Sequence, residues 1–194
     1  MPTALAIEKQ RFTFGDKWTI AFKYDDTKFY REGPERLKGD LEGATRATRA
    51  VDVVDVVGLH AAAGLLLLEA KDFRGHRIEN KTRIKHREIV VEVALKVRDT
   101  VAGLIGAARQ NVSEFDSAEI KKACNRGKDL VIVLWLEDDA SKDALRWKQQ
   151  LEVLTQEMKA KMSWLDAKFF VLSHSTQNRL PDLTVTNLPG AGQP

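Results

Sequence analysis

Residues 50–75 read AVDVVDVVGLHAAAGLLLLEAKDFRG, and this stretch decides the fold. The Val-rich run at 50–59 favours a β-strand, because branched side chains pack well on a pleated surface. A short turn at 60–64 follows, and then a second apolar run at 64–73 whose last residues are charged. Two such runs joined by a short turn predict a β-hairpin whose second strand is buried at its start.

The remainder of the chain predicts strands and helices in alternation. Residues 83–109 carry an apolar stripe at three- and four-residue steps, which is typical of a long helix packed on a core. We expect further strands at 18–24, 129–137, 169–172 and 183–186, and helices at 117–126 and after Ser141. This order predicts an α/β fold with a mixed central β-sheet and flanking helices. We expect one domain over 1–187 and a flexible Gly- and Pro-containing tail over 188–194.

Composition narrows the class of protein. The 194 residues include 31 basic and 28 acidic side chains, for a formal net charge of +3. The single cysteine, Cys124, excludes an internal disulfide and a four-cysteine zinc site, which favours a reducing compartment. The first residues have no secretory pattern, and no apolar run reaches the roughly 18–20 residues of a membrane span. These features predict a cytoplasmic protein.

The end of the second hairpin strand carries the residues that could perform chemistry. Glu69 and Lys71 are two apart on a strand, so both side chains leave the same face. A turn centred on 61–62 places 52–54 opposite 69, which brings the carboxylate of Asp52 beside that of Glu69, while Asp55 is expected to point to the other face. Two such carboxylates repel each other unless a cation separates them, and their oxygens suit Mg²⁺ or Mn²⁺. Lys71 could then orient or deprotonate an attacking water.

These residues resemble the core of the PD-(D/E)XK nuclease superfamily, in which a hairpin brings an Asp beside a (D/E)-x-K triplet and a helix follows. The resemblance covers about residues 17–140 and implies a restriction-endonuclease-like fold and metal-dependent cleavage of DNA phosphodiesters. It makes Asp52, Glu69 and Lys71 the catalytic residues, with Asp52 and Glu69 as metal ligands. The residue before the first acid is Val51 rather than Pro.

Several positions leave alternatives open. Many members of the superfamily carry a further Glu near the N-terminus, and the candidates in this chain are Glu8, Glu32, Glu35 and Glu42. The helix after the lysine often adds a polar residue, here Glu92 or Lys96, although their i,i+4 spacing equally fits an ordinary surface pair. Acid-x-Lys triplets recur elsewhere in the chain, so a plain salt bridge at a strand end is the competing interpretation of Glu69 and Lys71.

Positive charge is concentrated directly after this motif. Residues 71–88 hold seven basic and three acidic side chains, whereas the whole chain nets only +3. Cations in such a place can hold a phosphate backbone without reading its sequence. The predicted nucleic-acid contacts are Arg74, Arg77, Lys81 and Arg83.

The pattern therefore predicts a Mg²⁺- or Mn²⁺-dependent nuclease acting on DNA. A homodimer would suit an enzyme that cuts both strands, because symmetric dimers are the commonest oligomers. Two alternatives remain: a binding or protein-interaction module on the same fold without catalysis, and a structural α/β protein unrelated to nucleic acid.

Overall fold

The structure is a computed structural model that describes residues 2–36, 52–76, 80, 83–84, 87–124, 129–139 and 143–190. One sheet has five strands in the order β3 (Trp18–Lys23), β4 (Val56–His60), β5 (Gly64–Asp72), β6 (Leu130–Glu137) and β7 (Lys168–Leu172). A second sheet has three strands in the order β1 (Thr3–Ile7), β2 (Gln10–Phe14) and β8 (Leu183–Asn187). The helices are α1 (Lys28–Glu32), α4 (Glu88–Gln110), α5 (Ser117–Cys124) and α6 (Ala144–Lys161), with short 3-10 helices η1 (Pro34–Arg36) and η3 (His174–Arg179).

The prediction of an α/β fold with a mixed sheet is confirmed. β3, β4 and β5 pair antiparallel, and β5, β6 and β7 pair parallel. The predicted hairpin is the pair β4–β5. Parallel neighbours need a crossover connection, and the segments that contain α4 and α6 supply it.

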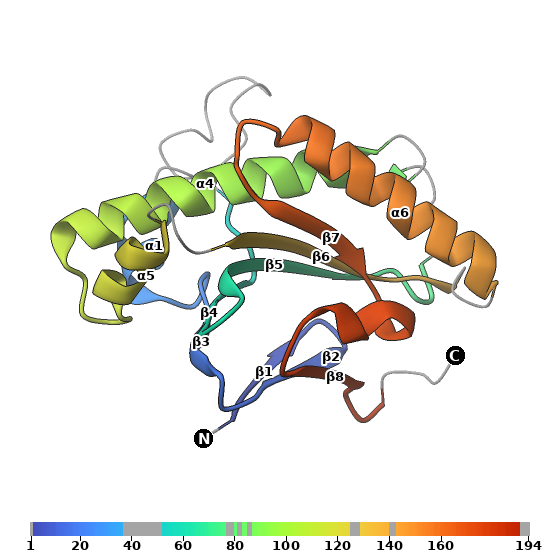
Figure 1. Cartoon of the computed structure of the whole chain (residues 1–194), viewed down its shortest axis with the longest axis horizontal. Coiled ribbons are helices and arrows are strands. Elements are labelled where there is room, and N and C mark those ends of the chain that lie inside the picture. Colours follow the sequence, from blue (N-terminus) through green and yellow to red (C-terminus); the bar gives the residue numbers. More distant parts are fainter. Residues whose placement is uncertain are drawn as a thin grey trace.

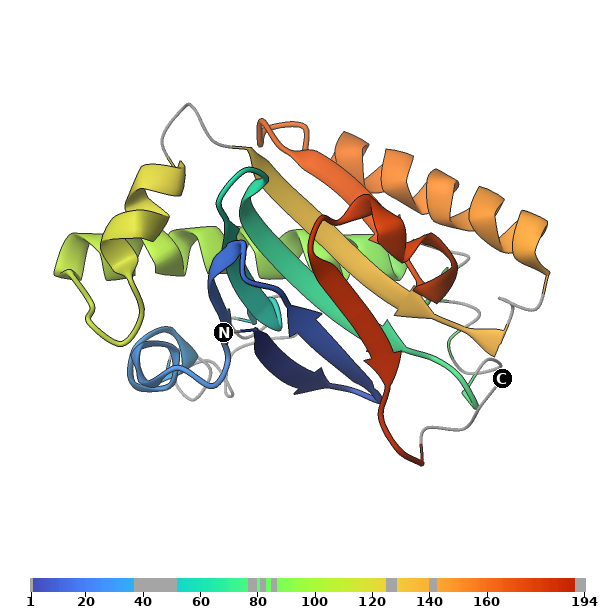
Figure 2. The same cartoon turned by 60° about the horizontal axis from the view of Figure 1, so that its bottom comes forward.

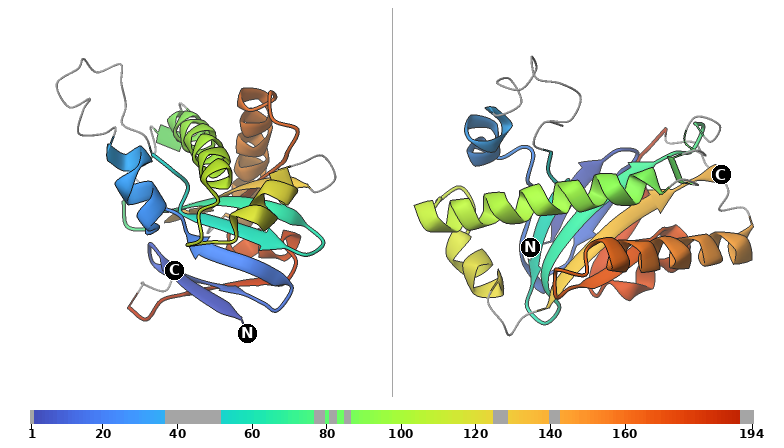
Figure 3. Two further views of the ribbon diagram at one scale, coloured as in Figure 1. Left: turned by 90° about the vertical axis from the view of Figure 1, so that its left-hand side faces the viewer. Right: turned by 90° about the horizontal axis from the view of Figure 1, so that it is seen from above.

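Three layers make up the molecule (Figure 1). α4 and α6 lie across one face of the five-stranded sheet, as the view from above in Figure 3 shows, and the three-stranded sheet covers the opposite face. Along β5, Leu65 and Leu67 face the helices, whereas Leu66 and Leu68 face the second sheet. The four consecutive leucines are therefore explained by burial on both faces.

Of the three-stranded sheet, only β8 was predicted from the sequence, and β1 and β2 were not. β1 and β2 form an antiparallel hairpin, and β8 joins the other edge of β2 (Figure 2). Alternate residues of β2 point inward, and the ring of Phe12 meets Trp135 of β6 edge to face at a centroid distance of 5.5 Å. This sheet, rather than further helices, buries the second face of the central sheet.

The first residue of β5, Gly64, lies directly against the backbone of Asp129 and fixes the end of the hairpin turn. Gly64 has φ +86°, and a Cβ there would lie 2.0 Å from the backbone oxygen of Asp129. Only glycine fits this approach, which lets Leu65 N donate a 2.9 Å hydrogen bond to the same oxygen and start the β5–β6 ladder.

Two remaining expectations concern the chain ends and a membrane. Leu188, the first residue of the predicted tail, donates its N–H to Lys9 O at 2.9 Å, while 191–194 lie outside the described residues. Within the described ranges, no helix has both the length and the apolar character needed to cross a membrane.

Candidate functional site

Glu69 and Lys71 project together from the C-terminal end of β5 toward α4. The Nζ of Lys71 lies 2.8 Å from Oε1 of Glu69, as their shared strand face predicts. Glu69 is only 1% exposed, so a charged carboxylate is held inside the protein at the end of an apolar strand. A buried charge of this kind requires compensation by cations or hydrogen bonds.

The acid that faces Glu69 is Asp55, and the predicted register is wrong. The last described pair of the hairpin is Val56 with Leu68, so the next position along places Asp55 opposite Glu69. Ala70 N donates a 2.7 Å hydrogen bond to the Asp55 carboxylate, which fixes that side chain against β5. The expectation that Asp55 points to the other face is therefore also wrong.

Residues 52–55 precede β4 and are held by α4 and by the residue that follows β3. Val54 N donates to Thr100 Oγ1 of α4 at 3.0 Å, and Tyr24 N donates to Asp55 O at 3.0 Å. The strand β4 begins at Val56, later than the Val-rich sequence suggests. Asp52 lies outside the strand, and its side chain is 54% exposed.

Two side chains of α4 complete the cluster. Lys96 Nζ lies 2.9 Å from Glu69 Oε1 and 3.3 Å from Asp52 Oδ2, so one lysine joins both predicted acids. Glu92 Oε1 lies 3.0 Å from Lys71 Nζ, and its other oxygen pairs with Arg83. Both residues were considered in the sequence as a possible surface pair, and the structure instead directs each of them at the β5 motif. We call the seven residues Asp52, Asp55, Glu69, Lys71, Arg83, Glu92 and Lys96 the Glu69 cluster.

The electrostatics of the Glu69 cluster are strongly perturbed. Burial, with the neighbouring Glu69 charge, raises the pKa of Asp55 to about 7. Burial lowers the pKa of Lys71, but the Glu69 and Glu92 carboxylates outweigh it and hold the pKa above its usual value. Burial likewise lowers the pKa of Lys96, but the Glu69 carboxylate outweighs it and holds that pKa above its usual value. At neutral pH both lysines are therefore cationic, and Asp55 is balanced between its two forms.

The donor set fits a divalent cation bound in part by water and substrate. Glu69 Oε2 is buried and has no hydrogen-bond partner among the described residues. No group of three or more His, Cys, Asp or Glu side chains in the described ranges is arranged as a metal cage. Mg²⁺ does not need one, because it usually keeps several waters and takes one or two carboxylates together with phosphate oxygens. If the site takes such an ion, Asp55 and Glu69 would be the carboxylates that hold it.

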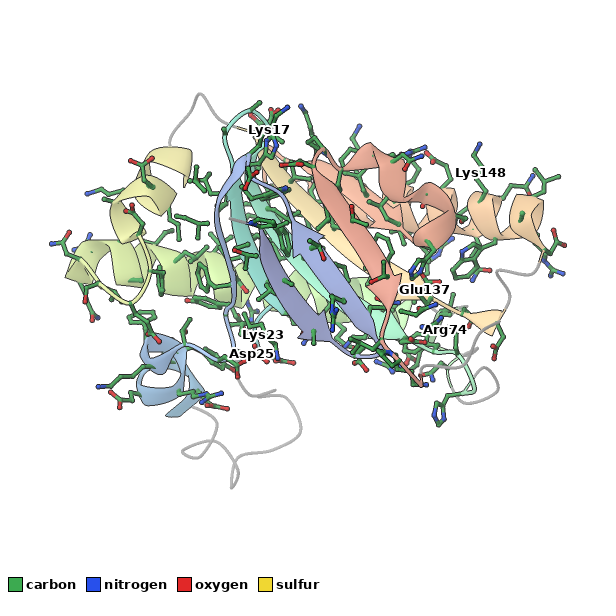
Figure 4. The ribbon with its side chains drawn as sticks, turned by 90° about the horizontal axis from the view of Figure 1, so that it is seen from below. Lys17, Lys23, Asp25, Arg74, Glu137 and Lys148 are labelled. Atoms are coloured by element: carbon green, nitrogen blue, oxygen red, sulfur yellow. The ribbon has the colours of Figure 1, made fainter. Side chains whose placement is uncertain are left out.

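The predicted basic contacts divide into three groups. Arg74 donates from Nε to both oxygens of Asp72, at 2.9 and 3.2 Å, and from Nη1 to Asn187 of β8 at 3.0 Å. Figure 4 shows Arg74 beside Glu137 on the side of the three-stranded sheet, and its side chain is only 11% exposed. Arg83 is half-exposed and binds Glu92, while Arg77 and Lys81 lie outside the described residues.

The candidates for an additional glutamate lie on other elements. Glu8 occupies the turn between β1 and β2, in the layer opposite α4, with φ +52°. Glu32 ends α1 and pairs with Lys28 at 3.8 Å, and Glu42 lies outside the described residues. Glu35 lies in η1.

A separate groove of about 670 Å³ runs beside β3, between β1 and the residues that precede α5. None of the residues lining it belongs to the Glu69 cluster. We therefore take the Glu69 cluster, rather than this hollow, as the candidate site, because perturbed pKa values tend to gather at functional sites.

Comparison with known proteins adds no assignment. No family model, no curated protein and no solved structure matches this chain. Function must therefore be argued from the geometry of the site itself.

Proposed function

We propose that this protein is a divalent-metal-dependent nuclease of the PD-(D/E)XK superfamily with a restriction-endonuclease-like fold, hydrolysing DNA phosphodiester bonds. The observation that carries the proposal is the meeting of Asp55, Glu69 and Lys71 at the end of the β4–β5 hairpin. The helix α4 and the parallel strand β6 follow in the order that the resemblance implies.

Each residue has a role that its environment supports. Asp55 and Glu69 would hold Mg²⁺ or Mn²⁺, which when bound lowers the pKa of a water and offsets charge on the phosphate. Because the pKa of Lys71 is raised, Lys71 acts as a cationic hydrogen-bond donor rather than as a base. It orients the attacking water and stabilises charge that develops on the phosphoryl oxygens as the bond to the leaving oxygen breaks.

The role proposed for Asp52 changes with the register. Asp52 is exposed and reaches Glu69 only through Lys96, so we assign it to the rim of the site. Of the predicted phosphate contacts that the structure describes, Arg83 is the one that contacts the site, through Glu92. Arg77 and Lys81 remain predicted phosphate contacts, and Arg74 is assigned a structural role because its donors already serve Asp72 and Asn187.

The test is cleavage of plasmid and of linear single-stranded DNA with Mg²⁺, Mn²⁺ or EDTA. We expect metal-dependent cleavage by the native protein and loss of it in Lys71→Met and Glu69→Gln. Metal-dependent cleavage that persists in purified Glu69→Gln protein would overturn the assignment.

A second candidate is a binding module without catalysis. One observation favours it: Glu69 Oε1 is already neutralised by two ammonium groups, so the cluster can stand as a self-contained ion-pair network. Such a protein binds DNA but binds no Mn²⁺ at the Glu69 cluster, which calorimetry distinguishes from the nuclease.

A further inference from the structure

Lys96 projects from the buried stripe of α4, between Val93 and Val97. A lysine on such a stripe must find partners, because an unpaired buried charge is strongly unfavourable. Its partners are Glu69 at 2.9 Å and Asp52 at 3.3 Å. The presence of a lysine on this buried face of α4 is therefore explained by its ion pairs with Glu69 and Asp52 rather than by apolar packing.

Two lysines bind Glu69 through a single carboxylate oxygen. Lys71 and Lys96 approach the same oxygen, Oε1, at 2.8 and 2.9 Å, while Oε2 accepts no hydrogen bond from the described residues. The two ammonium groups thus crowd one side of a single buried carboxylate.

The second partner of each lysine decides which is held more firmly. Lys71 is also bound at 3.0 Å by Glu92, which is mostly buried and is itself fixed by Arg83. Lys96 is bound at the longer distance of 3.3 Å by Asp52, whose exposed side chain can move into solvent. By its second partner Lys96 is the less constrained of the two, although its side chain is the more buried, at 10% exposed against 18% for Lys71.

We propose that Lys96 is an internal counter-cation that competes with the divalent ion for Glu69. The inference rests on the proposed function, since it requires a metal site at Asp55 and Glu69. An ion held by Glu69 lies within a few ångströms of both ammonium groups, where repulsion is strong because little water screens it. The less constrained ammonium, that of Lys96, then leaves Glu69 and follows Asp52 toward the solvent edge.

The consequence is a reciprocal coupling. If the ion must displace the Lys96 ammonium from Glu69, the free energy of that displacement weakens ion binding. Removing the charge of Lys96 should therefore tighten ion binding by about the free energy that the displacement costs. An ordinary structural salt bridge makes the opposite prediction, because its loss would disorder Glu69 and weaken the site.

The experiment is a Mn²⁺ titration, followed by calorimetry and by electron paramagnetic resonance, of the full chain without DNA. The variants are Lys96→Met and Lys96→Gln, and Arg98→Met is the matched control because Arg98 is exposed on the same helix and pairs with Asp99. We expect both Lys96 variants to bind Mn²⁺ at least about fivefold more tightly, within the range usual for coupled sites. Arg98→Met should bind like the native protein. Equal or weaker binding by both folded Lys96 variants overturns the proposal.

A second measurement covers the case in which Lys96→Met does not fold, and it uses the native protein. The ¹⁵Nζ signals of the lysines are recorded during a Mg²⁺ titration, and that of Lys96 is assigned by its absence in Lys96→Gln. We expect the Lys96 signal to shift at saturating Mg²⁺, and an unmoved signal overturns the proposal. If neither the native protein nor any of the variants binds metal, the proposed function is overturned as well. If the native protein and the variants bind metal equally, only the competition by Lys96 is overturned.

Discussion

The backbone N–H of Ala70 donates a 2.7 Å hydrogen bond to the carboxylate of Asp55. The bond holds Asp55, which lies just before β4, against Ala70, the residue between Glu69 and Lys71. It fixes the Asp55 carboxylate directly against β5, whereas Asp52 contacts Glu69 only through Lys96. The two aspartates therefore form a natural pair for mutation.

We expect Asp55→Asn to lose metal binding and DNA cleavage while Asp52→Asn largely retains both. The loss should be at least the roughly 10–100-fold that removal of an outer partner of a metal ligand costs, because a ligand itself is removed. Mn²⁺ affinity and the cleavage rate are the two measurements. The opposite ranking of the two variants would return Asp52 to the metal site.

Asp55 should also make the stability of the protein depend on pH. Its pKa is raised to about 7, so between about pH 4 and pH 7 the folded protein binds a proton that the unfolded chain has released. The free energy of unfolding therefore falls as pH rises through this window, by at most about 1.4 kcal/mol per pH unit from this group, and levels off above it. Urea unfolding with EDTA at several pH values measures the slope. Asp55→Asn should flatten it, and parallel curves for the two proteins would contradict the expectation.

Arg74 should prove structural. The side chain of Asp72 is buried and loses every hydrogen bond from the Arg74 guanidinium in Arg74→Met, which keeps only the bond from the backbone N–H of residue 74. Removing the cationic partner of this buried carboxylate should cost about 3–5 kcal/mol of stability. The double variant Arg74→Met, Asp72→Asn should recover most of this loss, because the buried charge is gone. Chemical unfolding of the three proteins gives the comparison. A folded Arg74→Met protein should bind DNA as the native protein does, and a selective loss of DNA affinity would restore Arg74 as a phosphate contact.

The second sheet should be essential to the core. Phe12 is fully buried against Trp135, so Phe12→Ala should lower the free energy of unfolding by about 3–5 kcal/mol. Arg11→Ala is the matched control, because Arg11 lies on the same strand and is exposed. Thermal or urea unfolding measures both variants. A small effect of Phe12→Ala would mean that the three-stranded sheet contributes little to stability.

Local sequence was sufficient for much of the central sheet. The hairpin, β6, α4 and the direction shared by Glu69 and Lys71 follow from runs of apolar residues and from the two-residue period of a strand. Gln10, Phe12 and Phe14 alternate with Arg11 and Thr13, and this alternation is also typical of a strand, so β2 was predictable from local sequence as well.

Contacts between distant elements determine which aspartate lies opposite Glu69. The residues 51–55 are part of the same Val-rich run, so nothing local marks Val56 as the first residue of β4. The hydrogen bond from Val54 N to Thr100 of α4 instead ties the preceding segment to a distant element. A shift of one residue in register reverses the face of a side chain, which is why a small error in the strand start exchanged Asp52 for Asp55.

The two-residue period of a strand is local, so the pattern of residues was enough to predict that Glu69 and Lys71 leave one face at the end of a buried strand. That Asp55 faces Glu69, and that Lys96 enters the same cluster from the buried side of α4, depends on how distant elements pack together. The physical reason is that a charge can be buried only where partners from other elements compensate it, and those partners are brought together by the packing of α4 on the sheet.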